Sequence, residues 1–195
     1  MGEVITLAPP RVERLVVELV GTSPLICHRW SDEKRKQILA KQTKAAARGK
    51  EAKDPEREYR DSLYVHSDGG YGFPAVGFKA AAVRAGTYAD QKMTFLRGAF
   101  HVEGELVPIT GEPRMREDMV RLQGSTADIR HRGEFPEWSA AVPVVVNLAA
   151  LSVEQLANLF VIAGFAVGVG DWRPERNGQF GRFEVAGIQA LRPAA

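Results

Sequence analysis

The sequence has few of the features that identify an exported or disulfide-bonded protein. Cys27 is the single cysteine among 195 residues, which excludes an internal disulfide and a zinc site built from several cysteines. The first residues, MGEVITLAPPRVERL, lack the basic and apolar blocks of a secretory signal. The longest nearly apolar run, residues 156–170, contains Asn158 and is shorter than the roughly 20 residues that a membrane span needs. We therefore expect a cytoplasmic protein with no membrane partner.

The sequence also contains little that indicates an enzyme or a metal site. Its four histidines form no HExxH motif or other short metal-binding spacing; they are His28, His66, His101 and His131. Cys27 and His28 are adjacent, but neighbouring side chains on a strand or turn point apart, so we interpret Cys27 as a small packing residue. We expect no catalytic residue, no metal and no cofactor.

Charge is nearly balanced over the whole chain but is concentrated in one segment. The net charge is +2 and the pI is about 8.8, values that do not by themselves identify a nucleic-acid-binding protein. Residues 31–60 carry ten basic and six acidic side chains, a local net charge of +4. A run of this kind is commonly a solvated helix face, and it also attracts a polyanion.

Hydrophobic patterns predict an α+β fold in a single domain of residues 1–195. Strands are expected at 14–20, 62–66, 140–147 and 182–191, with two more within 95–109 around Gly98 and Gly104. Helices are expected at 75–85, between Pro74 and Gly86, and after a capping box formed by Ser152 and Gln155. The core order of strand, helix, strand, strand, helix, strand is that of a ferredoxin-like (RRM-like) split βαβ fold.

Two insertions are expected in this core. The first, residues 31–60, contains a basic helix that starts at Ser31 or Asp32 and stops near Gly49, followed by a solvated loop from 51 to 60 that includes Pro55. The helix has a thin apolar face, so we expect it to be peripheral or to order against a partner. The second, residues 110–138, is an exposed hairpin-type insertion rich in arginine, with little apolar periodicity.

The segment that is most informative about function is the glycine- and arginine-rich stretch 168–185. Its glycines permit unusual backbone conformations, and exposed amides of such a turn favour anions. Arg173, Arg176 and Arg182 add positive charge, while Trp172 and Phe180 offer faces on which bases can stack. An ordinary helix-to-strand connection with solvated arginines explains the spacing equally well. The stretch matches neither the P-loop nor the dinucleotide-binding motif.

Two segments resemble the RAMP superfamily, the repeat-associated proteins that form the backbones of CRISPR effector complexes. They are FPAVGFKAAAVR at 73–84 and GQFGRFEV at 178–185. In that family a strand ends in proline, a lysine-containing helix follows, and a glycine-rich loop precedes the last strand. The opening VVELVGTSPL at 16–25 also resembles the first strand and turn of the backbone subunits. The second insertion stands where those subunits carry a thumb-like hairpin that reaches a neighbouring copy.

The resemblance implies a nucleic-acid interface on particular residues. It places Lys79 on the first helix against the nucleic-acid backbone, and the 178–182 stretch in the glycine-rich loop. This chain departs from the family pattern at Val76 and Gly77, at Ala80, at Arg84 and at Gln179. The predicted nucleic-acid-binding residues are Lys79, Arg84, Trp172, Arg173, Arg176, Gly178, Phe180, Gly181, Arg182, His28 and Arg29.

The leading hypothesis is therefore a backbone-type subunit, not an enzyme, that binds single-stranded nucleic acid. RNA is expected in preference to DNA, and copies of the chain are expected to form a head-to-tail homo-oligomer along the strand. One alternative is a structural or assembly protein, of viral or cellular origin, that uses the fold for protein contacts. Another is a metal-independent endoribonuclease, for which Asp32 is the nearest carboxylate candidate and is equally suited to capping a helix.

Overall fold

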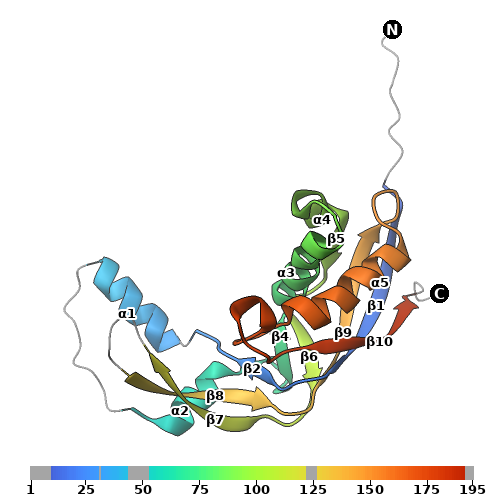
Figure 1. Ribbon diagram of the computed structural model, residues 1–195. Coiled ribbons are helices and arrows are strands. Elements are labelled where there is room, and N and C mark those ends of the chain that lie inside the picture. The colour runs from blue at the N-terminus through green and yellow to red at the C-terminus, as the bar shows by residue number, and fades with distance from the viewer. Residues whose placement is uncertain (1–9, 31, 44–52, 122–126, 192–195) are drawn as a thin grey trace.

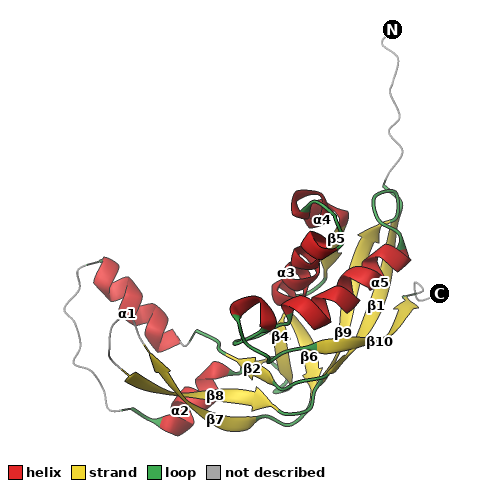
Figure 2. Cartoon of the chain, in the orientation of Figure 1, coloured by secondary structure: helices red, strands yellow, loops and turns green. Residues whose placement is uncertain are grey.

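A computed structural model of the protein describes residues 10–30, 32–43, 53–121 and 127–191 (Figure 1). The described chain contains helices and strands in a mixed order (Figure 2). Every strand pair in its two sheets is antiparallel. The fold is therefore mixed α+β with antiparallel sheets, which confirms the predicted class at this level.

The larger sheet is built around β1, Val12–Gly21, whose apolar side chains alternate along the strand. Leu15, Val17 and Leu19 are buried on one face, as the period of two in a half-buried strand requires. The strands lie in the order β10-β1-β9-β6-β4-β3, with β5 also paired to β9. Their bounds are β3 Tyr64–Val65, β4 Tyr71–Pro74, β5 Phe100–Val102, β6 Leu106–Thr110, β9 Ser139–Asn147 and β10 Phe183–Ala190.

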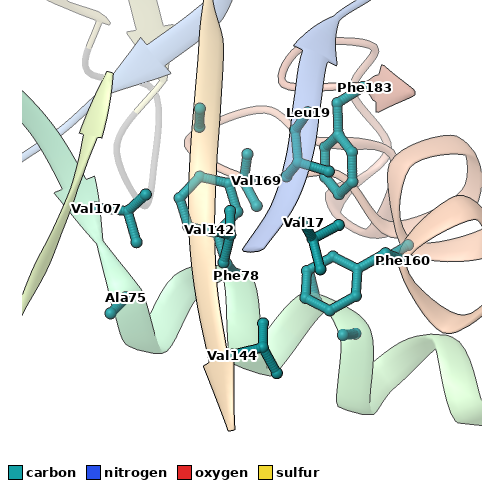
Figure 3. Close-up of a cluster of buried hydrophobic side chains, with 14 of the residues drawn as sticks. Val17, Leu19, Ala75, Phe78, Val107, Val142, Val144, Phe160, Val169 and Phe183 are labelled. Atoms are coloured by element: carbon teal, nitrogen blue, oxygen red, sulfur yellow. The ribbon is translucent and has the colours of Figure 1, made fainter. Parts of the chain in front are cut away.

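Two helices, α3 (Ala75–Ala85) and α5 (Val153–Ile162), lie over one face of this sheet (Figure 1). Phe78 of α3 and Phe160 of α5 point into the same core as Val17 and Val144 (Figure 3). The predicted capping box is confirmed, because Ser152 and Gln155 exchange hydrogen bonds at the start of α5. The segment Ala163–Val167 continues α5 as a π-helical turn that leads into the glycine-rich loop.

The second sheet lies to one side of the first and has the order β2-β8-β7 (Figure 1). Its strands are β2 Leu25–Cys27, β7 Arg114–Arg121 and β8 Ala127–Phe135, so the second predicted insertion contains a hairpin. Its predicted exposure is wrong toward its end, where Phe135 and Trp138 are buried in the core. Helix α2, Pro55–Ser62, packs on β8, where the Gly133 amide donates to the Ser62 hydroxyl at 2.7 Å. Cys27 is buried in β2, which confirms its predicted packing role.

Three predicted elements differ in the structure. The expected loop at 51–60 is wrong from Pro55 onward, because Asp54 caps the Arg57 amide and Pro55 occupies the first turn of α2. The expected strand at 62–66 is reduced to Tyr64–Val65, since Ser62 ends α2. The first of the two strands expected within 95–109 is largely replaced by α4, Met93–Ala99, which buries Leu96 and Ala99 at helical spacing.

The basic helix of the first insertion is α1, Asp32–Gln42. Ser31 and residues 44–52, including the predicted stop at Gly49, lie outside the described residues. Within the described ranges, no helix combines the length and the apolar character needed to cross a membrane.

Substitutions on α3 test which face of the helix carries the core. Phe78→Ala removes a buried ring that packs against Phe73 in the core and is expected to cost about 3–5 kcal/mol of unfolding free energy. The control Val76→Ala, on the exposed face of the same helix, is expected to change it by less than about 0.5 kcal/mol. Urea denaturation measures both. Equal costs for the two variants would contradict this packing.

Candidate nucleic-acid interface

The glycine-rich loop between α5 and β10 is tightly folded on itself. Gly168, Gly170 and Gly181 have φ angles of 70°, 80° and 65°, a region that side chains rarely adopt. A Cβ atom at Gly181 would collide with the carbonyl oxygen of Val169, and one at Gly178 with that of Trp172. At these positions a side chain would collide with neighbouring atoms, so the conformation of the loop requires glycine.

The amides of this loop are largely used inside the protein. Gly168 donates to Ala163, Val169 to Gly181, and Gly181 to Pro24 at 2.7 Å. The amides of Gly178 and Phe180 donate to carbonyl groups within the loop. The expectation of an anion cradle of exposed amides is therefore not met at these positions, and phosphate contacts from them would have to come from side chains.

A buried guanidinium joins the loop to the β7–β8 hairpin. The side chain of Arg132 in β8 is 2% exposed, and it donates to Asp118 of β7 at 2.7 Å and to Asp171 of the loop. A buried charge is tolerated when carboxylates replace the water that it loses. Arg132 therefore requires the loop and the hairpin to lie against each other.

Two further arginines extend this network along the hairpin. Arg116 donates to Asp118 at 2.9 Å and to Glu134 at 2.8 Å, and Arg114 donates to Glu134 at 2.7 Å. Burial alone would raise the pKa of Glu134, but the hydrogen bonds from Arg114 and Arg116 outweigh it and lower the pKa. The carboxylate therefore stays ionised, and both arginines are held by protein groups.

The two predicted stacking residues are in contact with the same arginines. Trp172 and Phe180 lie with their ring centroids 6.1 Å apart. The Cζ atom of Arg132 is 4.7 Å from the Trp172 centroid, and that of Arg116 is 4.7 Å from the Phe180 centroid. Cation–π contact is a favourable use of these ring faces. Trp172 and Phe180 thus help to lock the loop onto the hairpin.

His28 is attached to the loop through Asp171. Its Nδ1 atom lies 3.2 Å from Oδ2 of Asp171, and both side chains are about one-third exposed. The hydrogen bond from His28, with the charge of Arg132 nearby, lowers the pKa of Asp171 to about 2. An ionised carboxylate only accepts hydrogen bonds, so Nδ1 of His28 is the donor in this contact.

Five further predicted residues differ in the partners that they contact. Arg84 of α3 and Arg173 of the loop both pair with Glu175, each at 2.9 Å, so they tie α3 to the loop. Arg176 and Arg182, by contrast, form no ion pair with any residue of the described ranges. Lys79 lies apart from them, beside β5, with its Nζ 3.0 Å from Nδ1 of His101.

Sequence reasoning missed the acidic half of this site and one aromatic residue. Asp118, Glu134 and Asp171 were not selected, although charged residues alternate along 114–118 and 130–134 in the manner of one charged face of a hairpin. Trp30, which follows His28 and Arg29, was also missed, and its indole is exposed.

Neither protein-family models nor curated proteins give a match to this sequence. Within the described residues, no group of three or more histidine, cysteine, aspartate or glutamate side chains is arranged to hold a metal ion. The only support for the candidate interface is therefore the position and the contacts of its own residues.

Removing a partner of the buried arginine tests the network. Asp118→Ala leaves Arg132 with one carboxylate and is expected to cost about 3–5 kcal/mol of unfolding free energy, because a buried charge loses compensation. Arg14→Ala breaks an exposed pair with Glu103 and serves as the control, with an expected cost below about 1 kcal/mol. Urea denaturation compares the two. A cost for Asp118→Ala as small as that of the control would contradict the network.

The lowered pKa of Asp171 predicts a dependence of stability on pH. Its value of about 2 lies below the ordinary 3.8, so the ionised carboxylate stabilises the folded state above about pH 4. That contribution disappears as the pH falls from about 4 to about 2. Because the side chain is partly exposed, we expect on the order of 1–2 kcal/mol. Unfolding free energies of wild type and Asp171→Asn should converge by this amount over that window, and a constant difference would contradict it.

Proposed function

We propose that the protein is a backbone-type subunit with a ferredoxin-like core that binds single-stranded nucleic acid, RNA in preference to DNA. The strand order supports this core. Two strand–helix–strand units, β1–α3–β5 and β9–α5–β10, interleave in the order β10-β1-β9-β5. The preference for RNA rests on the resemblance of residues 73–84 and 178–185 to the RAMP superfamily.

The observation that carries the proposal is the convergence of three elements on one loop. The Arg84–Glu175 pair brings in α3, the Arg132–Asp171 pair brings in the β7–β8 hairpin, and His28–Asp171 brings in the segment after β2. The loop carries seven of the eleven residues that the sequence selects for nucleic-acid binding, and α3 and the segment after β2 carry two each. A strand that follows the loop would contact all of them in turn.

The cations of the loop and of the elements that converge on it differ in their capacity to bind phosphate. The network of Arg116 and Arg132 is neutralised by carboxylates, so a phosphate would have to displace an internal partner there. Arg176 and Arg182 need no such displacement, because neither is paired with a carboxylate in the described chain. We therefore assign the phosphate contacts of the loop to Arg176 and Arg182, and a separate contact on α3 to Lys79.

Binding through these cations is expected to be electrostatic. Lys79→Ala and Arg182→Ala should each raise the dissociation constant about five-fold and lower the salt slope by about one, since each removes one phosphate contact. Arg14→Ala, whose exposed arginine lies on β1 away from the loop, is the control and should bind as wild type does. Fluorescence anisotropy of a labelled oligo(U) strand at several salt concentrations measures all three. The proposal would be contradicted if wild type does not bind the strand at low salt, or if its dissociation constant does not change with salt concentration.

A head-to-tail contact between copies would continue the track beyond one subunit. Two apolar side chains on the helix layer are available for it, Val76 at 71% exposure and Phe165 at 78%. Light scattering during the same titration should show a mass that grows with the length of the strand. A closed dimer whose mass is indifferent to nucleic acid would contradict this part of the proposal and favour a structural role in protein contacts.

One observation favours a second candidate function, cleavage of RNA without a metal. The ionised Asp171 holds the Nδ1 proton of His28, so Nε2 is placed to take a proton from a 2′-hydroxyl group. The 2′-oxygen would attack the adjacent phosphorus, the P–O5′ bond would break, and the 5′-oxygen would take a proton from water. Fragments of end-labelled RNA that are produced by wild type and not by His28→Ala would establish this function. RNA that stays intact with wild type would exclude cleavage and leave binding as the only proposed function.

A further inference from the structure

We propose that Trp30 is a stacking platform for one unpaired base of the bound strand. This inference deepens the proposed function and rests on it. The Trp30 side chain is 64% exposed, whereas Trp138 is buried and Trp172 is half-buried against Arg132. Tryptophan is rarely left in water without a partner, because its large apolar surface is costly to hydrate. An exposed indole therefore needs an explanation in terms of a ligand or a partner.

The segment that carries Trp30 is held by contacts of the three preceding residues. Cys27 is paired with Gly133 in the sheet, and His28 contacts Asp171 of the loop at 3.2 Å. The amide of Arg29 then donates to the carbonyl of Ser62, at the end of α2, at 2.9 Å. Because these contacts fix the chain next to Trp30, the stacking of a base on the indole costs little conformational entropy of the protein.

The surroundings of Trp30 favour a polyanion over an apolar protein surface. Arg29 precedes it, and Arg60 is exposed two residues before the Ser62 carbonyl that anchors Arg29. Arg35 and Lys36 are exposed on the first turns of α1. Cores of protein interfaces are depleted in lysine, whereas cations beside an aromatic ring are the usual composition of a single-strand binding surface.

Trp30 also supplies what the predicted stacking residues lack. Trp172 and Phe180 already have a guanidinium against one ring face, 4.7 Å from each centroid. Through His28 and Asp171, Trp30 is connected to the loop that carries Arg176 and Arg182. The ligand class is a single strand with any base at this position, because every base has a π face.

The test compares strands and variants by anisotropy at fixed salt. The probes are an oligo(U) strand and the same strand with several abasic residues. Trp30→Ala should weaken oligo(U) binding about ten-fold with an unchanged salt slope, and Trp30→Phe should recover most of the loss. The abasic strand should bind wild type and Trp30→Ala equally. Tyr88→Ala, which removes another exposed aromatic side chain, is the control and should bind oligo(U) as wild type does.

Each outcome decides the inference separately from the proposed function. Oligo(U) that binds wild type and Trp30→Ala equally well overturns the stacking role and leaves the binding function intact. A Trp30→Ala variant whose mass in light scattering falls without nucleic acid assigns the indole to a protein contact and overturns it as well. If wild type binds neither strand, the proposed function fails and the stacking role fails with it.

Discussion

The buried charge of Arg132 is the constraint on which the junction of the two sheets depends. An arginine side chain that is 2% exposed is stable only where carboxylates and hydrogen bonds replace its lost hydration. Asp118 reaches it from β7 and Asp171 from the glycine-rich loop, so both have to be in place before the charge is compensated. The loop can approach this closely because Gly178 and Gly181 leave room where its backbone packs on itself. Arg132 therefore stabilises both the fold and the candidate site.

The same constraint divides the cations of the site into two classes. Arg114, Arg116 and Arg132 neutralise carboxylates of the hairpin and the loop, and two of them also cover the rings of Trp172 and Phe180. Their role is to hold the junction together. Arg176, Arg182 and the indole of Trp30 are exposed or half-exposed, and the proposed function assigns the phosphate and base contacts to them. Because the net charge of the chain is only +2, the proposed binding depends on these local cations and not on the overall charge.

Local signals in the sequence predict the central elements, and tertiary contacts decide the remainder. The alternation of β1, the span of α3 and the capping box of Ser152 are encoded by neighbouring residues. The error at α2 arose because Pro55 also suits a first helical turn when Asp54 caps it. The pairs of Arg132 with Asp118 and Asp171 span 14 and 39 residues, and no periodicity within one segment reports them. Trp30 was missed because its exposure depends on anchors from distant segments.

Photo-crosslinking of an RNA strand that carries 4-thiouridine, followed by mass spectrometry of the peptides, tests this division of the cations most directly. The account predicts crosslinks to the peptide that contains Trp30 and to residues 176–182, with none to the face of the hairpin formed by Arg116 and Arg132. Crosslinks concentrated on that internal face, or on the sheet surface around Arg14, would contradict the account.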